Sequence, residues 1–226
     1  MPQGGLRSCK ELREAKRISW IDKRLTAADL TTLGKQDSVL PALEKLVIFE
    51  ATGAAGPDSV QPLFEGLGAG ALPAIFSLQL INVHMGDTGA SALAAALGRG
   101  ALPRLESLML YNTTIGDAGL VALAPALRRL PALVGVFVSN PLGDEGIAAL
   151  VTPLPPAGAP PTTRGGLTKL MVLSLDDTQV ADAGCAALAA ALGSGALPAF
   201  SSLFSEGIPA SAAAQAAVQA ALDRHG

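Results

Sequence analysis

The side chains that most often carry out catalysis are few in this chain and far apart. It has two histidines, His84 and His225, and two cysteines, Cys9 and Cys185, in 226 residues. A metal site or an acid–base pair needs such groups close together, at spacings that these four residues do not have. We therefore expect no catalytic residue, metal ligand or cofactor-binding residue among them, and we expect Cys185 to pack as a small apolar side chain.

Four aspartates, each just ahead of an apolar helical pattern, form the most regular set of chemical groups: Asp87, Asp117, Asp144 and Asp182. Acid–base catalysis by carboxylates requires two of them in one pocket with separated pKa values. A carboxylate at the start of a helix instead accepts hydrogen bonds from free N–H groups and favours the positive helix end. We therefore predict that these aspartates cap their helices.

Glycine and proline motifs also have ordinary explanations. Gly34-Lys35 lacks the upstream glycine of a phosphate-binding loop, and the alternating glycines of residues 66–70 lead into Leu72-Pro73 rather than into a helix. Pro153 and Pro156 fit the minimal P-x-x-P pattern of ligands for aromatic grooves. We interpret the glycines as a linker and the prolines as part of a surface loop.

A repeat of about 30 residues positions all these groups. The sequence G-A-L-P recurs at residues 70–73, 100–103 and 195–198. The pattern L-x-x-L-x-L ends at Ile48, Leu80, Leu110, Val138 and Leu175, at intervals of 32, 30, 28 and 37 residues. A second block with apolar steps of three and four follows each triplet, as in residues 86–97, and indicates a helix. Each unit is therefore predicted to be a strand, a turn, a helix and a return.

These two linked patterns resemble the leucine-rich-repeat family, in its ribonuclease-inhibitor-like class. The resemblance implies an α/β solenoid shaped as a horseshoe arc, with a parallel sheet on the concave face and helices on the convex face. We expect one domain of about seven units over residues 15–222, a proline-rich insertion at 152–166, an N-terminal flank at 1–14 and a tail at 223–226. The family's turn residue is Asn or Cys. In this chain the corresponding positions hold other residues, so we predict an incomplete ladder of hydrogen bonds between the turns. These residues are Ala51, Val83, Thr113 and Thr178.

Side chains alternate along a strand, so the residues beside the buried aliphatics should line the concave face. We expect a partner to contact Val47, Phe49, Gln79, Ile81, Met109, Tyr111, Phe137, Asp176 and Phe204. A polar row at the strand ends is expected to form the rim: Asp22, Glu50, Asn82, Asn112, Asn140 and Asp177. An apolar, aromatic centre with a polar rim is the anatomy of a protein-binding patch.

Two other interpretations of this face stay open. A flanking segment could cover it, or a register shift of one residue could exchange the two faces of a strand. The fourth unit is one residue short between Val138 and Leu142, so the position of Phe137 depends most on the register. Asp176 and Asp177 could pair with a basic partner or simply be solvated.

Composition narrows the class of protein. A net charge of −3 and 15% charged residues do not indicate a nucleic-acid binder, which would carry a basic patch. No apolar N-terminal signal and no run of about 18 apolar residues occurs. We expect a cytoplasmic monomer that contacts no membrane.

The predicted function is non-catalytic binding of a partner protein on the concave face. The alternative is an enzyme regulator, such as an activator of a Ran-type GTPase, although the chain ends at 220–226 without that family's acidic tail. A third possibility is that the repeats are a lid within a larger sensor or scaffold.

Overall fold

The computed structural model describes residues 9–35, 40–51, 60–152 and 166–224. Residues 153–165 of the predicted proline-rich insertion lie outside the described part of the chain. So do His225 in the predicted tail and residues 1–8 of the predicted N-terminal flank. None of the helices in the described ranges has the length and apolar character that crossing a membrane requires.

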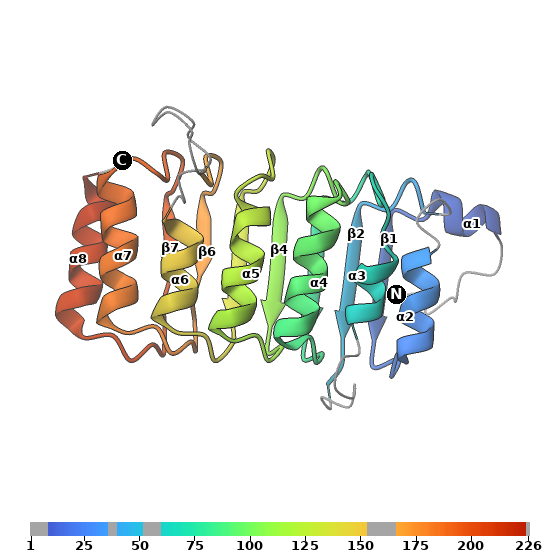
Figure 1. Cartoon of the computed structure of the whole chain (residues 1–226), viewed down its shortest axis with the longest axis horizontal. Coiled ribbons are helices and arrows are strands. Elements are labelled where there is room, and N and C mark those ends of the chain that lie inside the picture. Colours follow the sequence, from blue (N-terminus) through green and yellow to red (C-terminus); the bar gives the residue numbers. More distant parts are fainter. Residues whose placement is uncertain (1–8, 36–39, 52–59, 153–165, 225–226) are drawn as a thin grey trace.

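Seven parallel strands form one open sheet in chain order (Figure 1). They are β1 (Arg17–Ile21), β2 (Lys45–Phe49), β3 (Ser77–Ile81), β4 (Ser107–Tyr111), β5 (Gly135–Ser139), β6 (Val172–Ser174) and β7 (Ser202–Phe204). Equivalent residues of successive units pair directly: Leu46 with Leu78, Leu78 with Leu108, and Leu108 with Val136. The predicted register is therefore confirmed, and the repeated sequence pattern and the stacked structure coincide.

Helices of successive units form the second layer. They are α2 (Ala27–Lys35), α3 (Gln61–Gly66), α4 (Gly86–Gly98), α5 (Asp117–Leu127), α6 (Asp144–Val151), α7 (Asp182–Gly193) and α8 (Ala212–Asp223), whereas α1 (Cys9–Glu14) precedes β1. Helices α2 to α8 each contact the next one and together cover one face of the sheet (Figure 1). The chain thus has the predicted leucine-rich-repeat solenoid fold. The sheet face turned away from these helices is its concave face.

The core lies between the two layers. In β3, Leu78 and Leu80 are buried and point toward the helices, whereas Gln79 between them is only half-buried. Helix α4 contributes the buried Leu93 and Leu97, from the apolar steps that the sequence shows. Burial of such side chains, at about 1.5–3 kcal/mol each, stabilises a unit only when a neighbouring unit completes the enclosure.

The recurring aspartates cap helices, but each caps the helix of the following unit, so the prediction that they cap their own helices is wrong. Asp87 lies inside the first turn of α4 and is not the N-cap residue. Its Oδ1 accepts hydrogen bonds from the backbone N–H groups of Gly116, at 2.8 Å, and Gly119, at 3.0 Å, at the start of α5. A carboxylate in the first turn of one helix here reaches sideways to the free N–H groups at the start of the next helix.

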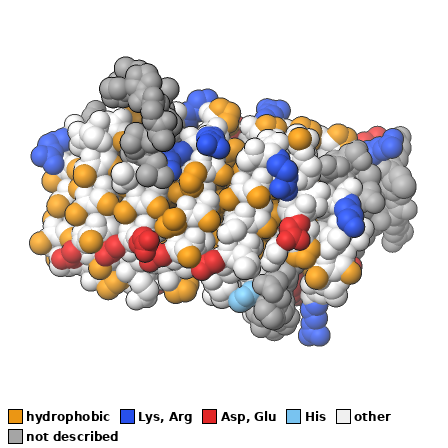
Figure 2. Space-filling model, in the orientation of Figure 1, with side chains coloured by type: hydrophobic (Ala, Val, Ile, Leu, Met, Phe, Trp, Pro, Cys, Tyr) orange, Lys and Arg blue, Asp and Glu red, His pale blue; other side chains and the backbone are white. Residues whose placement is uncertain are grey.

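The same link recurs along the solenoid. Asp117 accepts from the start of α6, Asp144 from the start of α7, and Asp182 from Ser211 at the start of α8. Figure 2 shows acidic side chains along the edge of the helical layer where these helices begin. Each junction therefore carries a negative charge at a positive helix end.

Candidate functional site

Two in-register rows of side chains line the concave face. The middle row runs across all seven strands through Ser19, Val47, Gln79, Met109, Phe137, Ser174 and Phe204. The second row, toward the strand ends, contains Ile21, Phe49, Ile81, Tyr111 and Ser139. Adjacent strands lie about 4.8 Å apart, so Phe49, Ile81 and Tyr111 are direct neighbours. The structure brings these three predicted residues together as expected.

Exposure differs within the rows. Phe49, Ile81, Met109 and Tyr111 are half-buried, which is the normal state of apolar side chains on one uncovered sheet face. Val47 lies on the predicted face but is only 7% exposed. It therefore supports its neighbours and offers little area of its own to a partner.

Phe137 occupies its predicted place in the middle row, opposite Met109. A Cβ atom at Gly135 would lie 2.8 Å from Cε2 of Phe137, so the aromatic ring extends back over the glycine. Glycine at this position lets the ring lie close to the sheet. The missing residue of the fourth unit falls after the strand, between Val138 and Leu142, and leaves the register of β5 intact.

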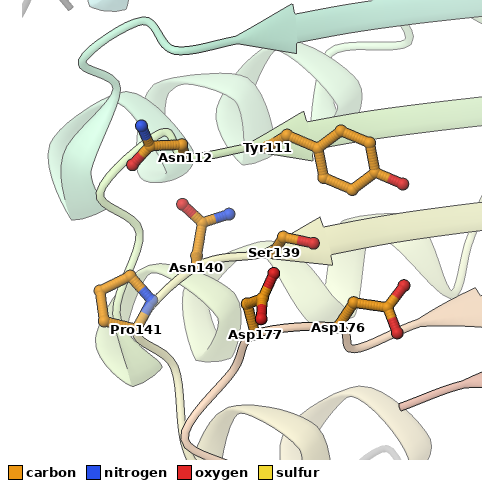
Figure 3. A pocket seen from close by; sticks show the side chains of 7 residues that line it. All are labelled: Tyr111, Asn112, Ser139, Asn140, Pro141, Asp176 and Asp177. Carbon is orange, nitrogen blue, oxygen red and sulfur yellow. The ribbon is translucent and has the colours of Figure 1, made fainter. Parts of the chain in front are cut away.

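Phe204 and Asp176 lie apart from this group. Phe204 pairs with Ser174, which in turn pairs with Phe137, so Phe204 is two strands from the nearest aromatic residue of its row. It is 52% exposed on the last strand of the described sheet. Asp176 lies two residues beyond the end of β6, and Figure 3 shows it across Ser139 from Tyr111, where it adds an acidic group beside the apolar rows. We define the remaining apolar group as the concave patch, formed by Phe49, Ile81, Met109, Tyr111 and Phe137.

Only some of the residues predicted to form the polar rim are exposed at the edge of the concave face. Glu50 and Asn140 are 1% and 3% exposed, so they are internal groups, contrary to the prediction. Oε1 of Glu50 accepts a hydrogen bond from the backbone N–H of Arg24 at 2.8 Å. Glu50 thereby joins the units of β1 and β2, because its side chain turns inward from the strand end.

Asn140 joins the units of β4 and β5 in a similar way. Its Oδ1 accepts from the backbone N–H of Thr113 at 2.7 Å, and its Nδ2 donates to the carbonyl oxygen of Leu110 at 2.6 Å. The Thr113 hydroxyl also donates to Oδ1 of Asn140, at 3.1 Å. The ladder of hydrogen bonds between turns, which was predicted to be incomplete, therefore has a link at this junction. The link is made by Asn140, one position before the turn position of the family pattern.

The other polar residues at the strand ends share a backbone conformation. Asp22, Asn82, Asn112 and Asp177 all have φ between 48° and 57°. Asn and Asp adopt this left-handed region more readily than other side-chain-bearing residues. The backbone thus explains why these residue types recur, and their side chains are left at the rim of the concave face.

A cavity of about 530 Å³ opens at the ends of β4 to β6 (Figure 3). It is lined by Tyr111, Asn112, Ser139, Asn140, Pro141, Asp176 and Asp177. Tyr111 and Asp176 were predicted to contact a partner, Asp177 to pair with a basic partner or be solvated, and Asn112 and Asn140 to lie in the polar rim. Ser139 and Pro141 were not predicted to belong to a site. Two features of the sequence could have indicated a cavity here. The segment after Val138 is one residue short, and Ser139 is small while the preceding residues of its row are large.

His84 and Cys185 lie in different units of the described chain. His84 lies in the turn before α4, where its Nδ1 is 3.1 Å from the hydroxyl of Thr114. Cys185 is buried in α7. In the described ranges, no three His, Cys, Asp or Glu side chains are placed to hold one metal ion.

Comparison with known proteins agrees with the repeat. A family model described as a leucine-rich repeat matches residues 166–189, which contain β6 and the first part of α7. The strand–helix units, the parallel sheet of the described residues and this match together show a leucine-rich-repeat fold.

The chain is also similar to the crystal structure of an internalin (InlF) from Listeria monocytogenes, at 15% sequence identity and a TM-score of 0.34. The similarity covers 81% of this chain and 61% of that chain, so it spans less than two thirds of the internalin. No curated protein matches the chain.

Proposed function

We propose that this chain is a non-catalytic protein-binding module of the ribonuclease-inhibitor-like repeat class, and that its partner binds the concave face. The observation that carries the proposal is the in-register row of Phe49, Ile81 and Tyr111 on a face that helices α2 to α8 leave uncovered. Met109 and Phe137 adjoin this row from the middle of the sheet.

Physical chemistry favours protein binding by such a patch. Large apolar side chains that are rigidly held and half-exposed release ordered water when a partner covers them, at about 25 cal/mol per Å² of apolar area. Aromatic residues near the centre of an interface are the usual hot spots. A sheet also holds these side chains in place before binding, so little conformational entropy is lost on association.

The unit architecture supports the class. Helices α4, α5 and α7 have 13, 11 and 12 residues, so a helix of about three turns follows each of the strands β3, β4 and β6. Long helices of this kind support the ribonuclease-inhibitor-like repeat class. We infer that residues 15–222 act as one domain, since one sheet runs through all seven described strands.

A photo-crosslinking experiment tests the proposed face. A photoreactive phenylalanine analogue at Ile81 should crosslink a partner protein in cells, whereas the same analogue at Val121, on the exposed side of α5, should not. The captured protein is then purified and its binding is measured directly with the isolated chain.

Substitution then measures the contribution of the patch. Phe49→Ala combined with Ile81→Ala should weaken partner binding by about 30-fold or more, since hot spots contribute about 2 kcal/mol. Val121→Ala is the matched control, and circular dichroism checks that both variants fold. Undiminished binding by the double variant, or equal crosslinking from Val121, would contradict a concave binding face.

A further inference from the structure

The cavity at the ends of β4 to β6 has a chemical character that differs from the concave patch. Figure 3 shows Tyr111 on one side and Asp176 on the other, with Ser139 between them. Asp177 points toward Ser139 from the turn after β6. The cavity therefore has an aromatic side and an acidic side, which two strand spacings of about 4.8 Å each separate.

A change of side-chain size within the second row opens this space. The row has Phe49, Ile81 and Tyr111 on β2 to β4, and then the small Ser139 on β5. Pro141, in the shortened segment after β5, also lines the cavity beside Ser139. The lining residues come from the ends of β4 and β5 and from the turns that follow β4, β5 and β6.

The acidic side is held in position. Oδ1 of Asp176 accepts from the backbone N–H of Glu206 at 2.7 Å, and its Oδ2 accepts from the Ser174 hydroxyl at 2.9 Å. Each carboxylate oxygen can accept a further hydrogen bond. The Asp177 side chain is exposed and forms no ion pair with the described residues.

No basic side chain of this face neutralises these groups. The outward positions of β3 to β7 and the turns that follow those strands contain neither Lys nor Arg. Asp176, Asp177 and Glu206 therefore give this end of the concave face a concentrated negative charge. Its complement is a cation brought by another molecule.

We infer that the cavity receives an arginine side chain of the partner protein, an inference that rests on the proposed function. A guanidinium group is planar and can stack on the Tyr111 ring while its N–H groups donate to the carboxylates of Asp176 and Asp177. The concave patch would then supply apolar contact area, and the cavity would select partners that present an arginine beside an apolar segment.

The test uses a small probe, so it does not require the partner. N-acetyl-arginine amide is titrated into the 15N-labelled chain, and the backbone amide signals of Asn112, Ser139 and Asp177 are followed by NMR. We expect saturable shifts at these residues and none in α4. The neutral citrulline analogue, which has nearly the same shape, should cause no saturable shift, and the lysine analogue should bind more weakly than the arginine probe.

Substitutions test which side chains bind the arginine probe. Asp176→Asn with Asp177→Asn should weaken binding of the arginine probe by about tenfold or more, because hydrogen bonds between charged groups contribute most. Glu106→Gln with Glu145→Gln removes two negative charges from exposed positions elsewhere and should leave binding unchanged. Tyr111→Leu should also weaken it, and provides a second variant if the double variant does not fold.

Three results would overturn the inference: no saturable shift around the cavity, equal binding of the citrulline analogue, or equal weakening by the control pair. If crosslinking from Ile81 still captures a partner in that case, the proposed binding face stands and the arginine pocket does not. If the probe binds as expected but no partner is captured, the failure lies with the proposed function.

Discussion

Asp117 of one unit accepts a hydrogen bond from the backbone N–H of Gly146 in the next unit, with 2.9 Å between N and Oδ1. The same Oδ1 lies 2.8 Å from the point that a Cβ atom at residue 146 would occupy. The aspartate thus accepts a hydrogen bond from the glycine and also fills the space beside it. The same pairing recurs between Asp87 and Gly119 and between Asp144 and Gly184. It makes the stability of each unit depend on its neighbour, as expected of a solenoid.

Removing one carboxylate should weaken one junction. Asp117→Ala leaves two N–H groups at the start of α6 without their acceptor, so we expect the free energy of unfolding to fall by about 1–2 kcal/mol. Asp117→Asn keeps an oxygen acceptor and should cost less. Urea unfolding followed by circular dichroism measures both. Glu145→Ala, an exposed acid in the first turn of α6, is the control, and an equal loss there would contradict the capping role.

Glycine at position 146 should be required for full stability because the carboxylate of Asp117 occupies the space that a side chain would fill. Gly146→Ala places a methyl group against Oδ1 of Asp117, and we expect a loss of about 1–3 kcal/mol from overpacking. In an Asp117→Ala background the same change should cost less, with a coupling of about 1 kcal/mol in a double-mutant cycle. Gly98→Ala, where nothing lies within 4 Å of the added atom, should be neutral or stabilising. Strict additivity of the two changes would rule out this explanation.

The fold was predictable because two periodic signals agreed. The aliphatic pairs such as Leu78 and Leu80 define a buried strand face, and the following apolar steps define a helix, so the sheet register follows from the repeat. Side chains that act between units were harder to assign. Asp87 stands at the start of a helix in the sequence, but its direction toward the next helix depends on how the units stack.

The candidate site was predictable to the same extent. Alternation along the strands identified Phe49, Ile81 and Tyr111 as neighbours on one face. Exposure was less predictable, because Val47 and Asn140 are buried by neighbouring units that are distant in sequence. The cavity beside Ser139 is lined by residues of three successive units, so no motif within one unit indicates it.

Asn140 should be the most sensitive polar residue at the strand ends. Asn140→Ala leaves the buried N–H of Thr113 and the carbonyl group of Leu110 without this partner, and we expect a loss of about 2–3 kcal/mol. Ser139→Ala, on the adjacent residue, is the control and should change stability by less than about 0.5 kcal/mol. Chemical denaturation compares the two variants. Similar stabilities for them would show that the link between these units is unimportant.

Cys185 should be a slowly reacting thiol, and its effect on stability should depend on pH. Burial raises the pKa of its thiol above the ordinary value, and the negative charges of Asp144 and Asp182 raise it further. Its folded pKa exceeds its unfolded pKa. Its contribution to stability is therefore fully present below the ordinary thiol pKa and is lost as the pH rises toward the folded value.

We expect the thiol of a Cys9→Ser variant to react with a disulfide reagent at pH 8 at least about tenfold more slowly when folded than when unfolded in urea. The control places a single cysteine at the exposed position 186 of α7, by Ala186→Cys with Cys9→Ser and Cys185→Ala, and should react quickly. Cys185→Ala should also remove part of the decline in stability above the ordinary thiol pKa. Fast modification of Cys185 in the folded chain would show that α7 opens readily or that the thiol is not enclosed, because the thiolate is the reacting species and needs both ionisation and access.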